Sequence, residues 1–382
     1  MSVDRVIHSA RLVDAGRVTD RAWVAFDQGR VVARGAGDGW RDLVPRAADD
    51  AAGRWLTPGF IDIHGHGGGG ASFDDGPDAV ATARAMHRAH GTTRAVLSLV
   101  TAAIGDLADR AAMVAELARA DATILGSHLE GPFLDPGHNG AHTAALLREP
   151  DQHTIERLLD AGAGTIRQVT LAPELDGGLP AVRRFVAAGV QVAVGHTAAD
   201  QFTTAAAFDA GATILTHAFN AMNGIHHRAP GPVVAALNDD RVTLEVVADG
   251  THVAPDVIRL LVRSAPGRLA LITDAMAAAG GADGSYALGG RQVTVTGGVA
   301  RLAGGGAIAG STLTQDAAIA LMVRRVGMPL PDAVRAATTV PAAAIGVADR
   351  FGALTPGRAA DAVLLDEDLA VVRVWVDGEP IA

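Results

Sequence analysis

Phe60-Ile61-Asp62-Ile63-His64-Gly65-His66 is the stretch of sequence that decides the fold, and four more glycines follow it. Its first residues are mostly apolar, include β-branched side chains and follow a Pro-Gly turn signal, which predicts a buried strand. Successive side chains of a strand point to opposite faces, so His64 and His66 should point the same way. Two imidazoles held together at a strand end can bind a divalent metal. Taken alone, the pair is only moderately specific, because histidine also occupies ordinary half-buried positions.

Strand-like and helix-like segments alternate after this stretch. The predicted strands are 60–66, 94–100, 123–130, 166–172, 190–196, 212–217, 242–249 and 269–274. Helices are predicted between most of them, for example over 77–90, 106–120, 151–161 and 200–210. This alternation predicts an α/β chain that forms a (β/α)8 TIM-like barrel. An open doubly wound sheet is the alternative fold.

Short strand-like segments separated by turn signals lie at both ends of the chain. Neither end alone has enough strand to bury a sheet face. We therefore predict that residues 1–56 and 350–382 form one small β-sandwich domain, and that residues 57–349 form the catalytic barrel. Residues 280–310 are rich in glycine and include the strand-like segment Gln292-Val293-Thr294-Val295, which predicts a hairpin inserted near the barrel mouth.

Composition excludes several classes of protein. Of the 382 residues 49% are hydrophobic and 19% charged, which is typical of a folded globular chain. There is no cysteine and no lysine, so disulfides, thiolate nucleophiles, Schiff bases and a lysine carbamate are all excluded. A net charge of −10 argues against nonspecific nucleic-acid binding. Without a membrane-length apolar run or a signal-like N-terminus, we expect a cytoplasmic protein without membrane contact.

Histidines and acids lie at the carboxyl ends of most of the predicted strands. They are His64, His66, Glu130, His196, His217, Asp249 and Asp274. In a barrel these ends meet on one face, where active sites are built. The sequence therefore predicts that these residues form one site.

The residue types in this set favour metal-assisted hydrolysis. His64, His66, Glu130, His196 and His217 provide four imidazoles and a carboxylate, a ligand set that suits Zn²⁺, Fe²⁺ or similar ions. Because lysine is absent, Glu130 is the evident candidate to bridge two metals. Asp274 could take a proton from an activated water and deliver it to a leaving amine. We expect the bond that is broken to be an amide or imide.

Several motifs carry a resemblance to a known family. The segment Pro58-Gly59-Phe60-Ile61-Asp62-Ile63-His64-Gly65-His66 resembles the opening motif of the amidohydrolase superfamily. The motif His128-Leu129-Glu130-Gly131-Pro132-Phe133-Leu134 is similar to that of its N-acetylglucosamine-6-phosphate deacetylase family. Further matching motifs contain Gly195-His196-Thr197, Thr216-His217-Ala218-Phe219-Asn220-Ala221-Met222 and Thr273-Asp274-Ala275. The likeness runs in order along nearly the whole chain.

The resemblance implies roles for individual residues. Glu130, His196 and His217 would hold the main metal, and Asp274 would be the general base and acid. His142 would help to polarise the acetyl carbonyl. The substrate-binding residues implied by the resemblance are Ala141, His142, Asn220, Ala221, Arg228, Asp249, His252, Ile308, Ala309 and Gly310. Asn220, Ala221 and Arg228 would receive the phosphate, and the counterpart of Arg228 in the family comes from the neighbouring subunit, which implies a homodimer.

The first-strand histidines place the chain in one branch of this family. Some relatives lack them and use one metal, whereas His64 and His66 imply a second site bridged by Glu130. We expect one or two divalent ions per subunit, zinc first, with iron, manganese, cobalt or cadmium as alternatives. Some relatives carry a cysteine in the loop over residues 135–139, and this chain has none, so a role for that thiol does not transfer.

Other interpretations remain open from the sequence. His196 and His217 could be ordinary buried histidines, Asp274 a helix N-cap, and His142, His252 and Arg228 plain surface residues. Among enzymes, the alternatives are a deacetylase of N-acetylgalactosamine 6-phosphate and a hydrolase of cyclic imides or dipeptides. An inactive barrel that serves as a scaffold is a different class, which loss of metal ligands would indicate.

Overall fold

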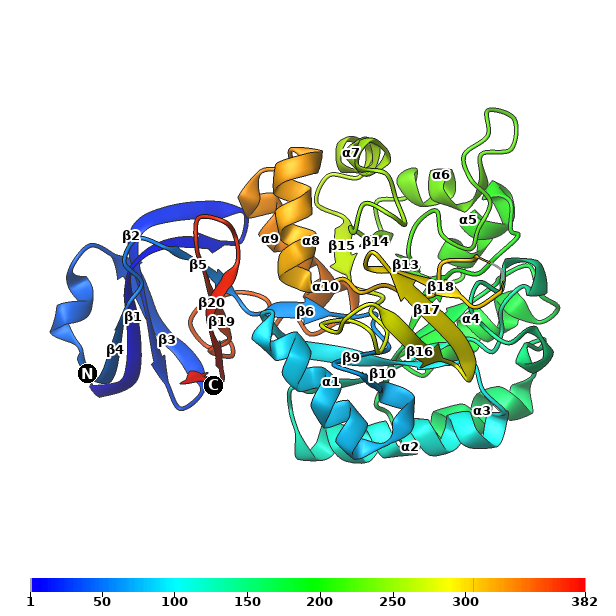
Figure 1. The fold of residues 1–382 in the computed structure, drawn as a ribbon, viewed down its shortest axis with the longest axis horizontal. Coiled ribbons are helices and arrows are strands. Elements are labelled where there is room, and N and C mark those ends of the chain that lie inside the picture. The colour runs from blue at the N-terminus through cyan, green and yellow to red at the C-terminus, as the bar shows by residue number, and fades with distance from the viewer. Residues whose placement is uncertain (1, 305, 382) are drawn as a thin grey trace. The chain divides into compact units, whose positions relative to one another are not determined.

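The computed structural model describes residues 2–304 and 306–381 (Figure 1). The chain divides into two compact units. The first contains Met1–Asp62, His87–Arg94 and Gln315–Ala382, and the second contains Ile63–Met86 and Ala95–Thr314. These units do not follow the predicted domain boundaries at 56/57 and 349/350, which stay a prediction. Among the described residues no helix is long and apolar enough to cross a membrane.

Strands from both termini form one sheet in the first unit. They are β1 (Ser2–Asp14), β2 (Arg17–Asp27), β3 (Arg30–Ala36), β4 (Val44–Asp50), β5 (Trp55–Pro58), β19 (Ala362–Leu365), β20 (Val371–Val376) and β21 (Glu379–Pro380). Their order is β21-β20-β19-β5-β1-β2-β3, with β4 paired to β1. The predicted β-domain built from the two ends of the chain is therefore confirmed.

The core of this β-domain joins the two termini. Ile7, Val24 and Phe26 of β1 and β2 share a buried cluster with Leu364 and Trp375 of β19 and β20. Neither end of the chain could bury these side chains without the other.

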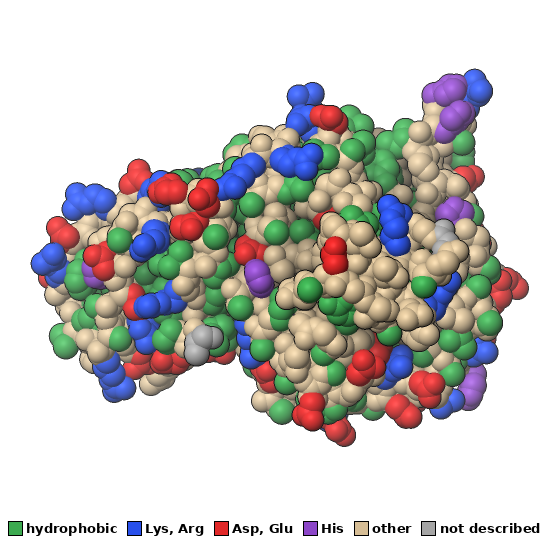
Figure 2. Space-filling model, viewed as in Figure 1, with side chains coloured by type: hydrophobic (Ala, Val, Ile, Leu, Met, Phe, Trp, Pro, Cys, Tyr) green, Lys and Arg blue, Asp and Glu red, His purple; other side chains and the backbone are tan. Residues whose placement is uncertain are grey.

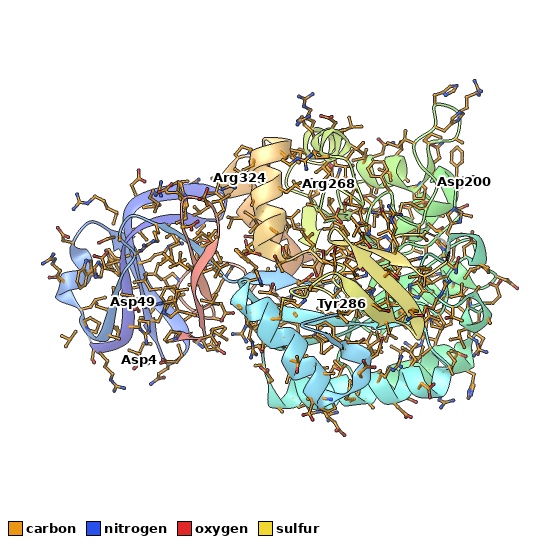
Figure 3. All side chains as sticks on the ribbon, in the orientation of Figure 1. Asp4, Asp49, Asp200, Arg268, Tyr286 and Arg324 are labelled. Atoms are coloured by element: carbon orange, nitrogen blue, oxygen red, sulfur yellow. The ribbon has the colours of Figure 1, made fainter. Side chains whose placement is uncertain are left out.

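Ion pairs connect the two ends of the chain to each other and connect the C-terminal segment to Arg94. Asp49 accepts hydrogen bonds from Arg5 at 2.7 Å and from Arg373 at 2.8 Å (Figure 3). Arg94, which is only 1% exposed, donates two hydrogen bonds to Asp361, at 2.6 and 2.9 Å. Bidentate pairing of this kind is what a buried arginine requires.

A second sheet contains the eight strands of the predicted barrel. These are β6 (Phe60–Asp62), β9 (Thr92–Val100), β10 (Ile124–Glu130), β11 (Ile166–Leu171), β12 (Gln191–Val194), β13 (Ile214–Leu215), β14 (Thr243–Val247) and β15 (Leu269–Ile272). The order β15-β14-β13-β12-β11-β10-β9-β6 follows the chain, and the registers from β9 to β15 are parallel. The (β/α)8 barrel is confirmed, and the open doubly wound sheet is not the fold.

Helices alternate with these strands as predicted. They are α1 (Pro77–Ala89), α2 (Ile104–Ala120), α3 (Gln152–Gly162), α4 (Gly178–Ala187), α5 (Gln201–Asp209), α6 (Gly231–Leu237), α7 (Pro255–Ser264), α8 (Gln315–Leu321), α9 (Leu330–Ala337) and α10 (Thr339–Ala344). Local chemistry sets some of their starts. Asp151 and Asp200 are N-caps whose carboxylates accept from the backbone N–H of Thr154 and Thr203, and Figure 3 labels Asp200 at the start of α5.

The predicted hairpin near residue 290 is present and has a third strand. It consists of β16 (Gly284–Leu288), β17 (Arg291–Thr296) and β18 (Val299–Leu302), which pair antiparallel (Figure 1). A smaller pair, β7 (Gly67–Gly68) and β8 (Ala71–Ser72), follows the first barrel strand.

The strand β6 is shorter than predicted, so another feature must bring His64 and His66 together. β6 ends at Asp62, so both histidines lie beyond it and strand alternation does not bring them together. Backbone hydrogen bonds to the segment after β15 hold them instead, from Asp274 N–H to His64 O at 2.9 Å and from His66 N–H to Ala275 O at 2.7 Å. These bonds connect the segments that follow the first and last barrel strands, which closes the ring at its carboxyl end.

Candidate active site

The Glu130 carboxylate is the centre of a cluster of imidazoles. In the described part of the chain, five histidine Nε2 atoms lie 3.1–3.2 Å from its two oxygens. His64, His196 and His217 face Oε1, whereas His66 and His142 face Oε2. Asp274 joins the cluster, with its Oδ1 3.4 Å from His66 Nε2. The structure thus brings together all the side chains predicted as metal ligands.

The backbone turns sharply at three residues of this cluster, just after their strands end. His196, His217 and Asp274 each lie two residues after an observed strand end and have φ of 48°, 26° and 47°. Non-glycine residues adopt such left-handed angles at an energetic cost, and in folded proteins this strain clusters at functional sites. The turn directs each side chain across the barrel mouth, and His196 is fixed further because its Nδ1 is 2.9 Å from the carbonyl of His138.

The two carboxylates of the site are almost fully buried, so their ionisation depends on the neighbouring side chains. Glu130 is 3% exposed and Asp274 is 9% exposed. Burial raises the pKa of Glu130, but His64, His142 and His196 outweigh it and hold this pKa well below its usual range. Burial likewise opposes ionisation of Asp274, yet its hydrogen bond with His66 and the charge of His64 lower its pKa to about 2. Both acids are therefore ionised at neutral pH.

The same carboxylates act on the histidines around them. Burial lowers the pKa of His66, but hydrogen bonds with Asp274 and Glu130 raise it overall to about 9. For His142 burial prevails over Glu130, and its pKa falls to about 4. His142 is therefore a neutral imidazole at neutral pH.

The donor atoms fit a divalent cation. His196 Nε2 and His217 Nε2 lie 3.0 Å apart, and each is within 3.2 Å of Glu130 Oε1. Four ligands at zinc distances of about 2.0–2.1 Å stand at a mutual separation of about 3.3 Å, so three donors with this spacing suit one tetrahedral ion. Two groups of three residues have donor atoms that all lie within 4.8 Å of one another inside the group. One group is His64, His66 and Asp274, and the other is Glu130, His142 and His196. The residues can therefore hold one ion or two.

A cavity of about 380 Å³ opens onto this cluster of histidines and acids. Among the predicted site residues it is lined by His66, Glu130, Ala141, His142, His196, His217, Asn220, Ala221, His252, Asp274, Ile308 and Gly310. His64, Arg228, Asp249 and Ala309 do not line it. His64 and Ala309 are fully buried, and Arg228 is exposed on a loop.

Asp249 contacts another site residue rather than the cavity. Its Oδ2 is 2.7 Å from His252 Nδ1, and its Oδ1 accepts from the backbone N–H groups of Thr251 and His252 at 2.8 Å. Asp249 thus orients His252. His142 is oriented in a similar way by Thr101, whose Oγ1 lies 2.9 Å from His142 Nδ1.

Several residues of the site were not predicted from the sequence. Glu245 in β14 is fully buried and contacts His64, and Gln168 in β11 contacts Glu245. His138 lines the cavity, and its backbone carbonyl accepts a hydrogen bond from Nδ1 of His196. A signal for Glu245 was present, because it is the one acid in the apolar run over residues 242–248. An acid inside a predicted buried strand needs a partner.

Arg228 lies on a loop that projects from the molecule. Residues 223–229 are exposed, and Ile225 is 45% exposed although it is apolar. Figures 1 and 2 show this loop standing out beside α5 and α6, with histidine and arginine side chains at its tip. The nearby Phe202, at the start of α5, is 73% exposed. Arg228 therefore does not reach the cavity of its own chain.

Comparisons with known proteins point to amidohydrolases that deacetylate amino-sugar phosphates. The Amidohydrolase family model matches residues 55–381. A protein from Escherichia coli O157:H7 named N-acetylgalactosamine-6-phosphate deacetylase is 42% identical over 345 residues, which cover 88% of this chain and 90% of that protein. An N-acetylglucosamine-6-phosphate deacetylase from Vibrio furnissii is 36% identical over 380 residues, covering 98% and 92%. A solved structure of a mutant N-acetyl-D-glucosamine-6-phosphate deacetylase from Mycobacterium smegmatis, in complex with N-acetyl-D-glucosamine-6-phosphate, is 45% identical with a TM-score of 0.93 and covers 99% of both chains.

We predict that replacing His217 by Ala weakens zinc binding by more than about 100-fold, because loss of a direct ligand should cost more than loss of a residue that only orients one. Competition with a chromophoric chelator measures this affinity. His153→Ala, which changes an exposed histidine, is the control and should bind zinc as the wild type does. Unchanged affinity in His217→Ala would remove His217 from the ligand set.

Proposed function

Because this chain belongs to the amidohydrolase family, we propose that it hydrolyses the N-acetyl group of N-acetyl-D-glucosamine 6-phosphate to give D-glucosamine 6-phosphate and acetate. The observation that carries this proposal is the convergence of Glu130, His196, His217 and Asp274 at the floor of one cavity. The relatives named for this activity support the substrate, and the Mycobacterium smegmatis protein was solved with that sugar phosphate bound. Cyclic imides and dipeptides have no such support.

The reaction depends on a divalent metal. We assign Glu130, His196 and His217 to the main ion; His64 and His66 would hold a second ion together with Glu130. Zinc suits these nitrogen and oxygen donors best, with iron, manganese, cobalt and cadmium as alternatives. When bound, such an ion lowers the pKa of a water molecule and polarises a carbonyl oxygen.

Asp274 has the position and charge of a general base. It is ionised, lines the cavity and lies beside His66. In the proposed reaction its carboxylate removes a proton from the attacking water, and it then gives this proton to the nitrogen as the C–N bond breaks. The water oxygen ends in acetate and the nitrogen leaves as the amine of the sugar.

Other residues of the cavity bind and orient the substrate. His142, which Thr101 holds through Nδ1, lies at the cavity wall, and we place it beside the acetyl carbonyl, which it would help to polarise. His252, held by Asp249, would contact sugar hydroxyls. The backbone around Ala141 and over residues 308–310 would line the sugar, and Asn220 with Ala221 would face the phosphate.

Arg228 completes the phosphate site only if a second subunit supplies it. Its own loop is exposed and does not line the cavity of the same chain. We propose a homodimer in which this loop crosses to the partner and Arg228 binds the phosphate there, since a guanidinium matches phosphate oxygens. A cytoplasmic location stays a prediction.

The proposed substrate is tested by acetate release. The zinc-loaded protein should hydrolyse N-acetylglucosamine 6-phosphate with the highest kcat/KM, the galactosamine epimer more slowly, and unphosphorylated N-acetylglucosamine by at least about 100-fold less, because an unfilled phosphate site forfeits charge-assisted hydrogen bonds. Higher kcat/KM for the galactosamine epimer would reassign the substrate. Equal rates on the unphosphorylated sugar would reject phosphate recognition.

Asp274→Asn should lower kcat by about 10²–10⁴-fold, because the amide cannot accept the proton. KM and metal content should change little. Steady-state kinetics and metal analysis of the same sample measure both. Asp240→Asn, at a side chain that is fully exposed, is the matched control. Activity of Asp274→Asn near that of Asp240→Asn would reject the role of Asp274.

The origin of the phosphate arginine is tested by mixing subunits. Arg228→Ala should raise KM for the phosphorylated sugar, with Arg183→Ala as an exposed control. When Arg228→Ala and Asp274→Asn subunits are co-expressed, random pairing in a twofold dimer gives about a quarter of the wild-type activity, since each mixed dimer has one intact site. If Arg228 acted within its own chain, the mixture would show no activity beyond that of the two parents.

A further inference from the structure

Glu245 is a buried acid that the proposed reaction does not use. It lies in the middle of β14, and its side chain is 0% exposed. Burying a carboxylate costs several kcal/mol unless charged or hydrogen-bonding partners compensate for it. Its partners therefore show what holds it inside the barrel.

Those partners include two of the assigned metal ligands. Glu245 Oε2 lies 3.0 Å from His64 Nδ1 and 3.3 Å from the backbone nitrogen of His217, and its Oε1 accepts from the Gln168 side-chain amide at 2.8 Å. The His64 and Gln168 side chains are also 0% exposed. Because both oxygens of the Glu245 carboxylate have partners, the group is held in one orientation.

The contact with Glu245 determines which nitrogen of His64 carries a proton. A carboxylate only accepts, so His64 Nδ1 donates to it. Nε2 of His64 then points to the cluster, 3.2 Å from Glu130 Oε1 and 3.7 Å from Asp274 Oδ1. A carboxylate behind a metal-binding histidine sets its tautomer and orientation and increases its basicity.

We propose that Glu245 is a positioning residue that holds His64 with Nδ1 protonated and Nε2 directed at the second metal site, and that Gln168 fixes Glu245 for this purpose. This inference rests on the proposed metal-dependent function. According to this proposal, the geometry with which His64 binds the second metal depends on Glu245, a residue that touches neither metal nor substrate.

Two substitutions separate the charge of Glu245 from its hydrogen bonds. In Glu245→Gln the new amide oxygen can still accept from His64, and Gln168 can turn its amide to accept from the new N–H. Gln168 Oε1 has no hydrogen-bond partner among the described residues, so this turn breaks no bond to that oxygen. In Glu245→Ala both contacts are lost. Ser127→Ala removes a buried hydroxyl in β10 that has no hydrogen-bond partner among the described residues, and it controls for a change in the barrel interior.

Zinc titration of the metal-free proteins against a chromophoric chelator tests the proposal. The wild type and Ser127→Ala should bind two ions per subunit. Glu245→Ala should keep the tighter ion and bind the second about 10–100-fold more weakly, with Glu245→Gln in between, because loss of an orienting partner costs this much. Nuclear magnetic resonance of ¹⁵N-labelled histidine gives a second measurement: the His64 Nδ1–H signal should persist in Glu245→Gln and vanish in Glu245→Ala.

Three results would overturn the inference. The first is a wild type that binds only one ion, and the second is an unchanged affinity of Glu245→Ala for the second ion. The third is an equal loss of affinity for both ions in Glu245→Ala, together with a lower unfolding temperature of its metal-free form. Failure of the proposed function is a separate observation, namely a fully metal-loaded wild type that releases no acetate from the sugar phosphates.

Discussion

The site depends on the burial of the Glu130 carboxylate, which is almost inaccessible to water at the end of β10. A charge in that position must be compensated locally, and five imidazoles from different parts of the chain converge on it. The same arrangement creates a cation site, because nitrogen and oxygen donors crowded at this spacing are complementary to a divalent ion. Charge balance and function are therefore achieved by one set of atoms.

The barrel makes this convergence feasible. Parallel strands bring their carboxyl ends to one face, so residues as distant in sequence as His64 and Asp274 become neighbours. The ring is closed there by backbone hydrogen bonds between the segments after β6 and β15. The left-handed turns at His196, His217 and Asp274 then direct the side chains across the mouth. Their conformational strain is sustained because the surrounding strands fix the backbone on both sides.

Below the ligands a layer of polar side chains fills part of the barrel interior. His128 lies between Ser98 Oγ at 2.9 Å and Thr170 Oγ1 at 2.8 Å, and Thr170 contacts Thr216 at 2.9 Å. Burial holds the pKa of His128 well below its usual range, so it remains neutral. A connected layer of this type is rigid because a member that moved would leave buried polar atoms unsatisfied. Glu245 and Gln168 extend the same construction under His64.

The sequence by itself determined the barrel, the β-domain formed from both ends of the chain, and which histidines and acids follow the barrel strands, because strand periodicity and short motifs are local properties of consecutive residues. It did not determine where β6 ends or what brings His64 and His66 together, since those depend on hydrogen bonds to a segment some 210 residues away. Nor did it reveal that Glu245 and Gln168 meet His64, or that Asp249 contacts His252 instead of the cavity. Only the tertiary structure decided these features, because a buried polar side chain is defined by partners from other strands, which no local pattern specifies.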